Sequence, residues 1–179
     1  MSSPIVQFTK AGLAELIDAK RLGIKGIITH ISAGDKGYTP SPDQQSLQHE
    51  IQRVEVSSFE NLSSTQIRLG AKFTGDAEYD VKEVGLWLET GTLLAVYSLP
   101  NERLTYKSAN SSWIQKFTLD ISALPTDSIT VEVGVDNLNL MLTEELLIMT
   151  TASVITNTTA IKTAHTQMQL SERLRLAGV

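Results

Sequence analysis

Four acidic side chains lie close together in the sequence and are the first candidates for chemistry: Asp76, Glu78, Asp80 and Glu83. Two carboxylates at a controlled separation are what glycoside hydrolysis requires, so a small glycan hydrolase is one function to consider. The polar break at Gly75-Asp76 predicts a loop here, however, and a loop favours a solvated acidic face. The sequence also has no nucleophile elbow, triad signature or zinc-protease helix. We therefore expect no catalytic residues and no enzymatic activity.

The three histidines, His30, His49 and His165, are far apart and none has the spacing of a metal ligand. His30 lies in a β-branched run and is expected to be an ordinary strand residue. His165 lies in the C-terminal segment, for which a self-associating helix is predicted below. If three such helices packed together, three copies of His165 could meet, and a metal site shared by three chains is the alternative. There is no cysteine, so disulfides and thiolate zinc sites are excluded. We expect no metal and no cofactor.

Two tryptophans, Trp87 and Trp113, could serve as stacking platforms for a sugar, as in a carbohydrate-binding module that recognises a receptor. Both lie in segments that alternate with other apolar residues, which favours core packing. Two glycine-rich segments, at 23–26 and 34–37, lack the spacing of a phosphate-binding loop and are interpreted as turns.

The bulk composition limits the partners. The chain has 179 residues, 41% hydrophobic and 20% charged, with a formal net charge of −5. A negative chain without runs of lysine or arginine has no field that attracts nucleic acid, so no nucleic-acid partner is expected. The N-terminus lacks the pattern of a signal peptide, and no apolar run reaches the length of a membrane span. We expect no membrane partner and synthesis in a cytoplasm.

Residues 1–136 have the pattern of a β-rich head. A helix is predicted over 9–22, with Thr9 as N-cap, Gly23 as C-cap, and an apolar stripe at Ala11, Leu13, Leu16 and Ile17. Strands are predicted at 27–31, around 51–59, 65–74, 84–88, 92–97, 113–121 and 129–135, whereas 100–111 reads as a long loop. Because most strands alternate apolar and polar residues, we predict a mainly β fold with α, a compact antiparallel sandwich-like head with one N-terminal helix.

Residues 137–179 have a different composition, with a seven-residue apolar spacing at Leu140, Leu147, Val154, Ile161 and Met168. The segment 154–158 resembles a motif of trimeric fibre stalks, in which an inward asparagine follows a β-branched core residue by three positions. We therefore predict a helical tail that forms a homotrimeric coiled coil. A single packed helix and an extended tail are the alternatives, since threonine and valine are poor helix formers. The predicted trimer interface consists of Leu147, Val154, Asn157, Thr158, Ile161 and Met168.

The apolar residues of the last segment leave the seven-residue spacing. Leu170, Leu174 and Leu176 lie on other faces of a helix, which predicts a docking segment for a neighbouring component. A frayed chain end is the alternative. This segment and the trimer seam together suggest an assembly protein.

Three segments of the head share a pattern with a known family: 8–14 (Phe-Thr-Lys-Ala-Gly-Leu-Ala), 28–35 (Ile-Thr-His-Ile-Ser-Ala-Gly-Asp), and 82–87 (Lys-Glu-Val-Gly-Leu-Trp) with 91–96 behind it. In this order they resemble the phage tail-collar fibre family over roughly residues 4–135. The resemblance implies an N-terminal attachment domain that fastens a trimeric fibre to the baseplate of a virion tail. It also implies a baseplate protein and a distal tail fibre protein as partners. Because little sequence follows the predicted stalk, we expect a short adaptor rather than a receptor-binding adhesin.

Overall fold

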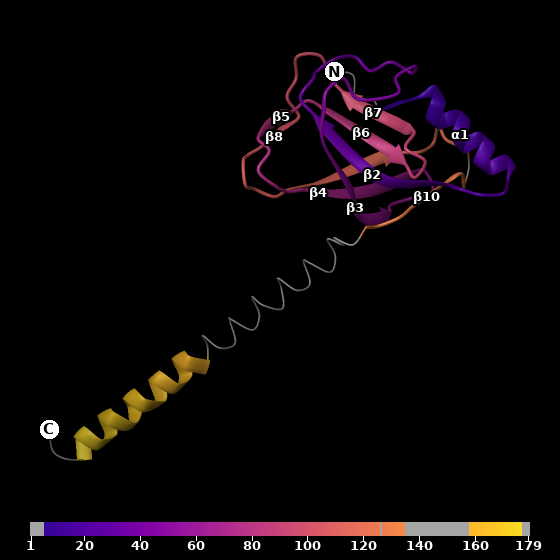
Figure 1. Cartoon of the computed structure of the whole chain (residues 1–179). Helices are drawn as coiled ribbons and strands as arrows, with labels where there is room; N and C mark the ends of the chain where they lie inside the picture. The colour runs from indigo at the N-terminus through magenta and orange to yellow at the C-terminus, as the bar shows by residue number, and fades with distance from the viewer. Residues whose placement is uncertain (1–5, 126, 135–157, 177–179) are drawn as a thin grey trace. The chain divides into compact units, whose positions relative to one another are not determined.

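The computed structural model of the chain describes residues 6–125, 127–134 and 158–176 (Figure 1). The chain divides into two units, Met1–Leu138 and Asn139–Val179, which are described separately. The predicted domain boundary at 136 lies outside the described residues. The first unit contains, in order, β1 (Gln7–Phe8), α1 (Lys10–Arg21), β2 (Gly26–Gly34), β3 (Glu50–Asn61), β4 (Gln66–Phe73), β5 (Tyr79–Val81), β6 (Glu83–Leu88), β7 (Leu93–Ser98), β8 (Thr105–Lys107), β9 (Trp113–Asp120) and β10 (Ile129–Val131).

One curled sheet forms most of the head, with the strand order β1-β7-β6-β2-β3-β4-β9 and β10 beside β2. The long strand β3 makes the curl possible. Its first half pairs with β2 and its second half with β4, and its register with β4 shifts between Val56 and Ser58. A bulge of this kind bends a strand and increases its twist. The mainly β prediction is confirmed, but the two facing layers are parts of one continuous sheet rather than two separate sheets.

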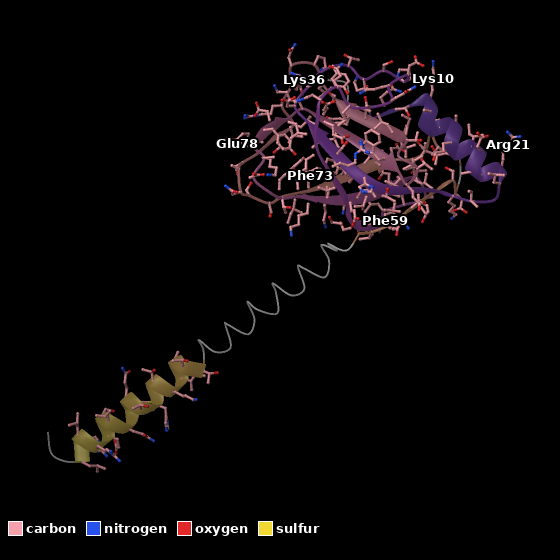
Figure 2. All side chains as sticks on the ribbon, viewed as in Figure 1. Lys10, Arg21, Lys36, Phe59, Phe73 and Glu78 are labelled. Atoms are coloured by element: carbon pink, nitrogen blue, oxygen red, sulfur yellow. The ribbon has the colours of Figure 1, made fainter. Side chains whose placement is uncertain are left out.

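The apolar core lies inside this curl. The alternation predicted for 65–74 is confirmed, because Ile67, Leu69, Ala71 and Phe73 are all buried. Figure 2 shows the labelled Phe73 inside the head. Its ring stacks on Trp113 of β9 with centroids 4.7 Å apart, and such aromatic pairs add to the free energy of burial. The hairpin predicted from the Glu89-Thr90-Gly91 turn is also confirmed as β6 and β7.

The helix α1 begins and ends where the sequence predicts, but it buries a different face. Thr9 is the N-cap and accepts a hydrogen bond from the Gly12 N–H, while Gly23 follows the helix with a φ of 76°. The buried positions are Gly12, Leu16 and Ala19. Ala11 is exposed and Ile17 is 50% exposed, so the predicted apolar stripe was wrong at these two positions. Because Gly12 has no side chain, α1 can approach β7 closely at this position. The face of the helix that carries Gly12 is therefore the one that is buried.

The remaining differences concern short segments. The predicted loop at 100–111 contains β8, which pairs with β5, and β1 was not predicted. The turn predicted at Gly34 is instead the end of β2, and residues 35–49 form a long connection to β3. β10 runs parallel to β2, not antiparallel, with Ile129 opposite Gly26. Strands of two or three residues lack enough positions to show alternation, so tertiary pairing determines them.

In the second unit, residues 158–176 form a helix, and every side chain on it is exposed. A C-terminal helix is therefore confirmed in part of the predicted tail. Among the described residues, no helix has the length and apolar character needed to cross a membrane.

Candidate functional site

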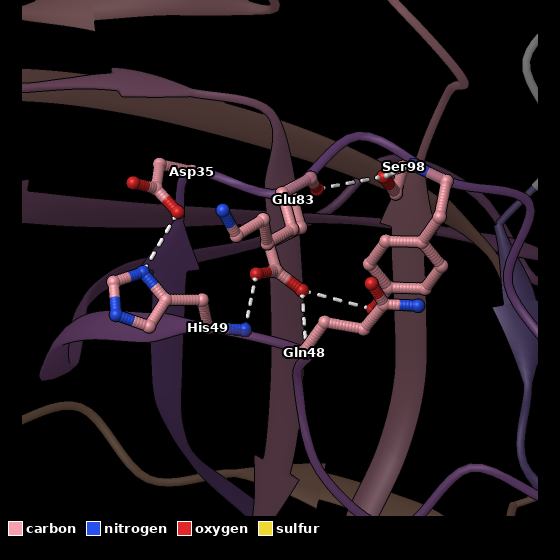
Figure 3. Close-up of polar contacts among 7 residues, drawn as sticks. Asp35, Gln48, His49, Glu83 and Ser98 are labelled. Atoms are coloured by element: carbon pink, nitrogen blue, oxygen red, sulfur yellow. Dashed lines mark hydrogen bonds and ion pairs between the residues drawn. The ribbon is translucent and has the colours of Figure 1, made fainter.

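Glu83, the first residue of β6, does not belong to a solvated acidic face as predicted. Its side chain is fully buried. One carboxylate oxygen accepts a hydrogen bond from the His49 N–H at 2.8 Å, and the other accepts one from the Gln48 N–H at 2.9 Å (Figure 3). The Tyr38 hydroxyl also donates to Glu83, at 2.9 Å. Three donors aimed at one carboxylate compensate for its removal from water.

These donors all come from the loop 35–49, which crosses the outer face of β6 and β7 and which we call the strap. Ser98 of β7 accepts from the Tyr38 N–H at 3.1 Å and donates to the Lys82 carbonyl at 2.9 Å. The strap is also held by apolar packing of Tyr38 and Leu47 on Trp87, Leu93 and Val96. Glu83 therefore anchors a loop to the sheet.

Burial changes the acidity of Tyr38 in the strap. Burial raises the pKa of the Tyr38 phenol to about 12, and the neighbouring Glu83 carboxylate acts in the same direction, whereas the hydrogen bond from Gln44 opposes it. The phenol is therefore a stable hydrogen-bond donor at neutral pH. An anionic oxygen beside Glu83 would repel the carboxylate.

The other three carboxylates lie at the surface of the head, and two of them have partners of their own. Asp76 is exposed. Glu78 accepts a hydrogen bond from the Tyr106 hydroxyl, which raises the pKa of that phenol. Asp80 pairs with Arg103 at 3.1 Å. The solvated face predicted for this cluster thus holds for Asp76, Glu78 and Asp80, and the fourth carboxylate serves the strap.

The histidines have local partners. His30 lies in β2, as predicted, with Nδ1 2.9 Å from the Thr29 hydroxyl. His49 Nδ1 is 2.7 Å from Asp35, and His165 Nε2 is 2.8 Å from the Gln169 amide. Within residues 6–125, 127–134 and 158–176, no three histidine or acidic side chains are grouped so that they could hold a metal ion.

Both tryptophans pack in the head, as the alternation predicted. Trp87 is 4% exposed, and its Nε1 donates to the Ser32 hydroxyl at 2.6 Å. The Arg53 guanidinium covers its ring at 3.6 Å from the centroid, the geometry of a cation–π contact. Trp113 lies between Phe73 and Phe117. The buried Trp87 ring is therefore not available as a sugar platform, and one face of the half-buried Trp113 ring is occupied by Phe73.

Three glycines mark close approaches between the segments that carry the family resemblance, 8–14, 28–35, 82–87 and 91–96. A Cβ on Gly12 would lie 2.7 Å from Leu94 Cα, and one on Gly34 would lie 2.6 Å from a Glu83 oxygen. A Cβ on Gly85 would lie 2.9 Å from the Ser32 hydroxyl. These segments are distant in sequence but pack directly on one another. Their contacts hold the fold of the head together and do not form a reactive centre.

The predicted interface residues divide between described and undescribed parts of the tail. Leu147, Val154 and Asn157 lie outside the described residues. Thr158, Ile161 and Met168 lie on the helix 158–176, as do Leu170, Leu174 and Leu176. The five aliphatic side chains are between 50% and 74% exposed.

These aliphatic side chains form two faces on the helix. At 3.6 residues per turn, Ile161 and Met168 are about 20° apart, whereas Leu170 and Leu174 lie roughly on the opposite side. The next position of the seven-residue spacing is Arg175, which pairs with Glu172 at 2.7 Å. The apolar seam of the described helix thus ends at Met168, and a second face follows it. The sequence predicted both the seam residues and the docking residues. The structure shows in addition that these side chains are exposed on the helix.

None of the curated proteins compared with the chain matches it. A family model for the N-terminal part of the phage tail-collar fibre protein matches residues 1–145. This match covers every segment on which the resemblance was based, and the structure shows these segments packed together in one head. The chain therefore belongs to the phage tail-collar fibre family, which indicates a structural component of a phage tail that associates with other tail proteins.

Proposed function

We propose that the protein is a short trimeric adaptor, in which the head fastens to a baseplate protein and the C-terminal segment trimerises and presents a distal tail fibre protein. The observation that carries this proposal is the helix 158–176, on which the Ile161 and Met168 side chains are exposed at a seven-residue spacing. The virion tail is the corresponding location.

The helix needs a partner for energetic reasons. Most helical stability in proteins comes from packing of an apolar face, and every side chain of the helix 158–176 is exposed in the single chain. Burying Ile161 and Met168 in a coiled coil would contribute about 1.5–3 kcal/mol for each side chain per chain. Ala164 at the intervening position is small, which lets helices approach closely. A homotrimer is the assembly that the stalk-like motif at 154–158 favours, and in it Leu147, Val154, Asn157 and Thr158 would continue the seam.

The head supports the same proposal. Its motif residues make internal contacts, as Gly12, Gly34 and Glu83 show, so its role would come from its surface and not from a reactive centre. Two observations weigh against the alternatives of a carbohydrate-binding module and a glycan hydrolase. The tryptophan rings are packed, and Glu83 is buried under the strap.

Light scattering of the full chain at micromolar concentration tests the proposal, with a trimer expected. The double substitution Ile161→Asp and Met168→Asp places charges on the seam and should reduce the mass to that of a monomer. The matched control, Thr163→Asp and Thr166→Asp, adds the same charge to the same turns on the opposite side. It should leave the trimer intact.

A second measurement uses a chain that ends near residue 135, which keeps the head with its own core. It should be monomeric and folded by circular dichroism. A full chain that remains monomeric at every concentration, or a seam variant with the same mass as the control, would contradict the proposed assembly.

A further inference from the structure

β9 forms a free edge of the head sheet. It pairs with β4 along its whole length, from Trp113 opposite Phe73 to Asp120 opposite Gln66. In the described part of the chain, no strand pairs with its other edge. Every second residue of an antiparallel strand directs its N–H and C=O away from its partner. An edge of eight residues is about 26 Å long and offers a template for another strand, which native proteins usually cover.

A cleft of about 280 Å³ borders this edge. Four consecutive residues of β9, Lys116–Leu119, line it, so the cleft follows the edge of the strand and not only one of its faces. The facing wall is mostly apolar and comes from the other end of the curled sheet: Val6, Val84, Leu86, Ala95 and Tyr97. The cleft therefore lies where the two ends of the sheet approach each other without pairing.

Two features of the edge indicate what would fit there. The Gln115 side-chain amide donates to the Lys116 carbonyl at 3.0 Å, a local substitute for a strand partner. Among the described residues that line the cleft, Lys116 and Tyr97 are ionisable and none is a carboxylate. An occupant with a carboxylate would complement Lys116, although the chain as a whole is acidic.

We propose that β9 and this cleft bind an extended segment of a partner protein by strand addition. The main chain of the segment would pair with the free edge of β9. Alternate aliphatic side chains would enter the cleft, and an acidic side chain on the other face would approach Lys116. In this binding mode the main chain supplies affinity and the pockets for alternate side chains supply specificity. The assignment of the partner as another tail protein rests on the proposed function; the binding chemistry does not.

The probe is a synthetic, fluorescein-labelled peptide of eight residues that alternates valine with glutamate and threonine. Fluorescence anisotropy with the full chain should give saturable binding in the micromolar to millimolar range. Methylation of every second amide nitrogen removes the donors that strand pairing needs and should abolish the binding. Hydrogen exchange should show that the peptide protects amides of β9, and not those of the hairpin β6–β7.

Charge reversal gives the sharper test. Lys116→Glu lies on an exposed position and should weaken binding of the glutamate peptide about tenfold, a change of about 1.4 kcal/mol. A peptide with lysine in place of glutamate should bind this variant more tightly than it binds the original chain. Lys162→Glu in the tail makes the same charge change elsewhere and should have no effect.

Equal binding of the methylated and unmethylated peptides would overturn the proposal, as would protection outside β9 or no binding at millimolar peptide. The seam variant Ile161→Asp/Met168→Asp should bind the peptide as the original chain does, because the cleft lies wholly in the head. A full chain that binds the peptide but forms no trimer would therefore contradict only the proposed assembly. A full chain that forms the trimer but does not bind the peptide would contradict only the strand-addition proposal.

Discussion

The carboxylate of Glu83 accepts a hydrogen bond from the main-chain N–H of His49, 34 positions away in the sequence, at 2.8 Å. The next N–H of the strap, that of Gln48, donates to the second oxygen. One buried side chain of β6 thus fixes the end of the strap just before β3 begins. The same contact explains Gly34, since any Cβ there would collide with the His49 carbonyl and the Glu83 side chain.

Glu83→Gln should lower the free energy of unfolding by about 1.5–3 kcal/mol, the usual contribution of a hydrogen bond to a charged group. The glutamine keeps one acceptor oxygen but places an NH2 group opposite a donor. Urea unfolding followed by circular dichroism measures the change. Glu60→Gln is the control, because Glu60 makes an exposed ion pair with Arg68 and should change stability by less than about 1 kcal/mol. Equal effects of the two substitutions would contradict the anchoring role of Glu83.

Gly12→Ala should destabilise the head even though alanine favours helix by about 1 kcal/mol over glycine. The added Cβ would lie 2.7 Å from Leu94 Cα and 3.0 Å from the Leu93 carbonyl, both backbone atoms that cannot yield without moving β7. Overpacking of this kind costs about 1–3 kcal/mol. Thermal unfolding should show a lower midpoint. Ala11→Gly is the control, because Ala11 is exposed and its substitution changes only the helix propensity. A higher unfolding midpoint for Gly12→Ala would contradict the prediction and show that α1 can move away from β7.

Lys107→Met should also destabilise the head, because the Lys107 side chain is fully buried. Its ammonium donates to the Gly75 carbonyl at 2.9 Å and to the Ala77 carbonyl at 2.7 Å. Methionine fills a similar volume but leaves both carbonyls without this donor, at a cost of about 1–3 kcal/mol for a buried group. Hydrogen exchange should show faster opening of β5 and β8. Unchanged exchange there would mean that the loop 74–78 does not depend on the ammonium.

Tyrosine ionisation should lower the stability of the head at alkaline pH. Burial raises the pKa of Tyr79 from 10.0 to about 12. Between these values the folded form keeps the proton that the unfolded chain has lost, so the unfolded state binds fewer protons and stability falls as pH rises from about 10 to about 12. Tyr79→Phe should give a shallower fall over this range. Urea unfolding across the range measures it, and parallel curves for the two proteins would contradict the raised pKa.

Alternation in the sequence predicted β4 and β9 because one face of each is more buried than the other, whereas β6, buried at every position, was predicted from its apolar run and the turn that follows it. Ile67, Leu69 and Phe73 of β4 show this directly. Alternation could not predict β5 and β8. Each has three residues, and the two strands form by pairing with one another. The parallel placement of β10 was also beyond it, since that depends on β3 leaving β2 and opening a position beside Gly26.

The character of Glu83 could not be predicted for a related reason. In the sequence it follows Asp76, Glu78 and Asp80, and its burial is due to a strap that begins 48 residues earlier, at Asp35, a separation visible only after folding. The glycine of Glu83-Val84-Gly85 was the signal that could have indicated a crowded strand. The exposed faces of the tail helix, by contrast, follow from spacing alone, because a helix of known register places each side chain.

The two aliphatic faces of the helix 158–176 should act independently. Leu170→Asp/Leu174→Asp puts two charges on the face roughly opposite Ile161 and Met168, so it should leave the mass by light scattering equal to that of the original chain. The seam variant should lose the trimer under the same conditions. A distal fibre protein should fail to bind the Leu170/Leu174 variant, although that variant is still trimeric, if this face is the docking surface. A monomeric Leu170/Leu174 variant would show instead that these leucines belong to the self-association seam, and the helices would then have to pack in a register other than the seven-residue spacing through Ile161.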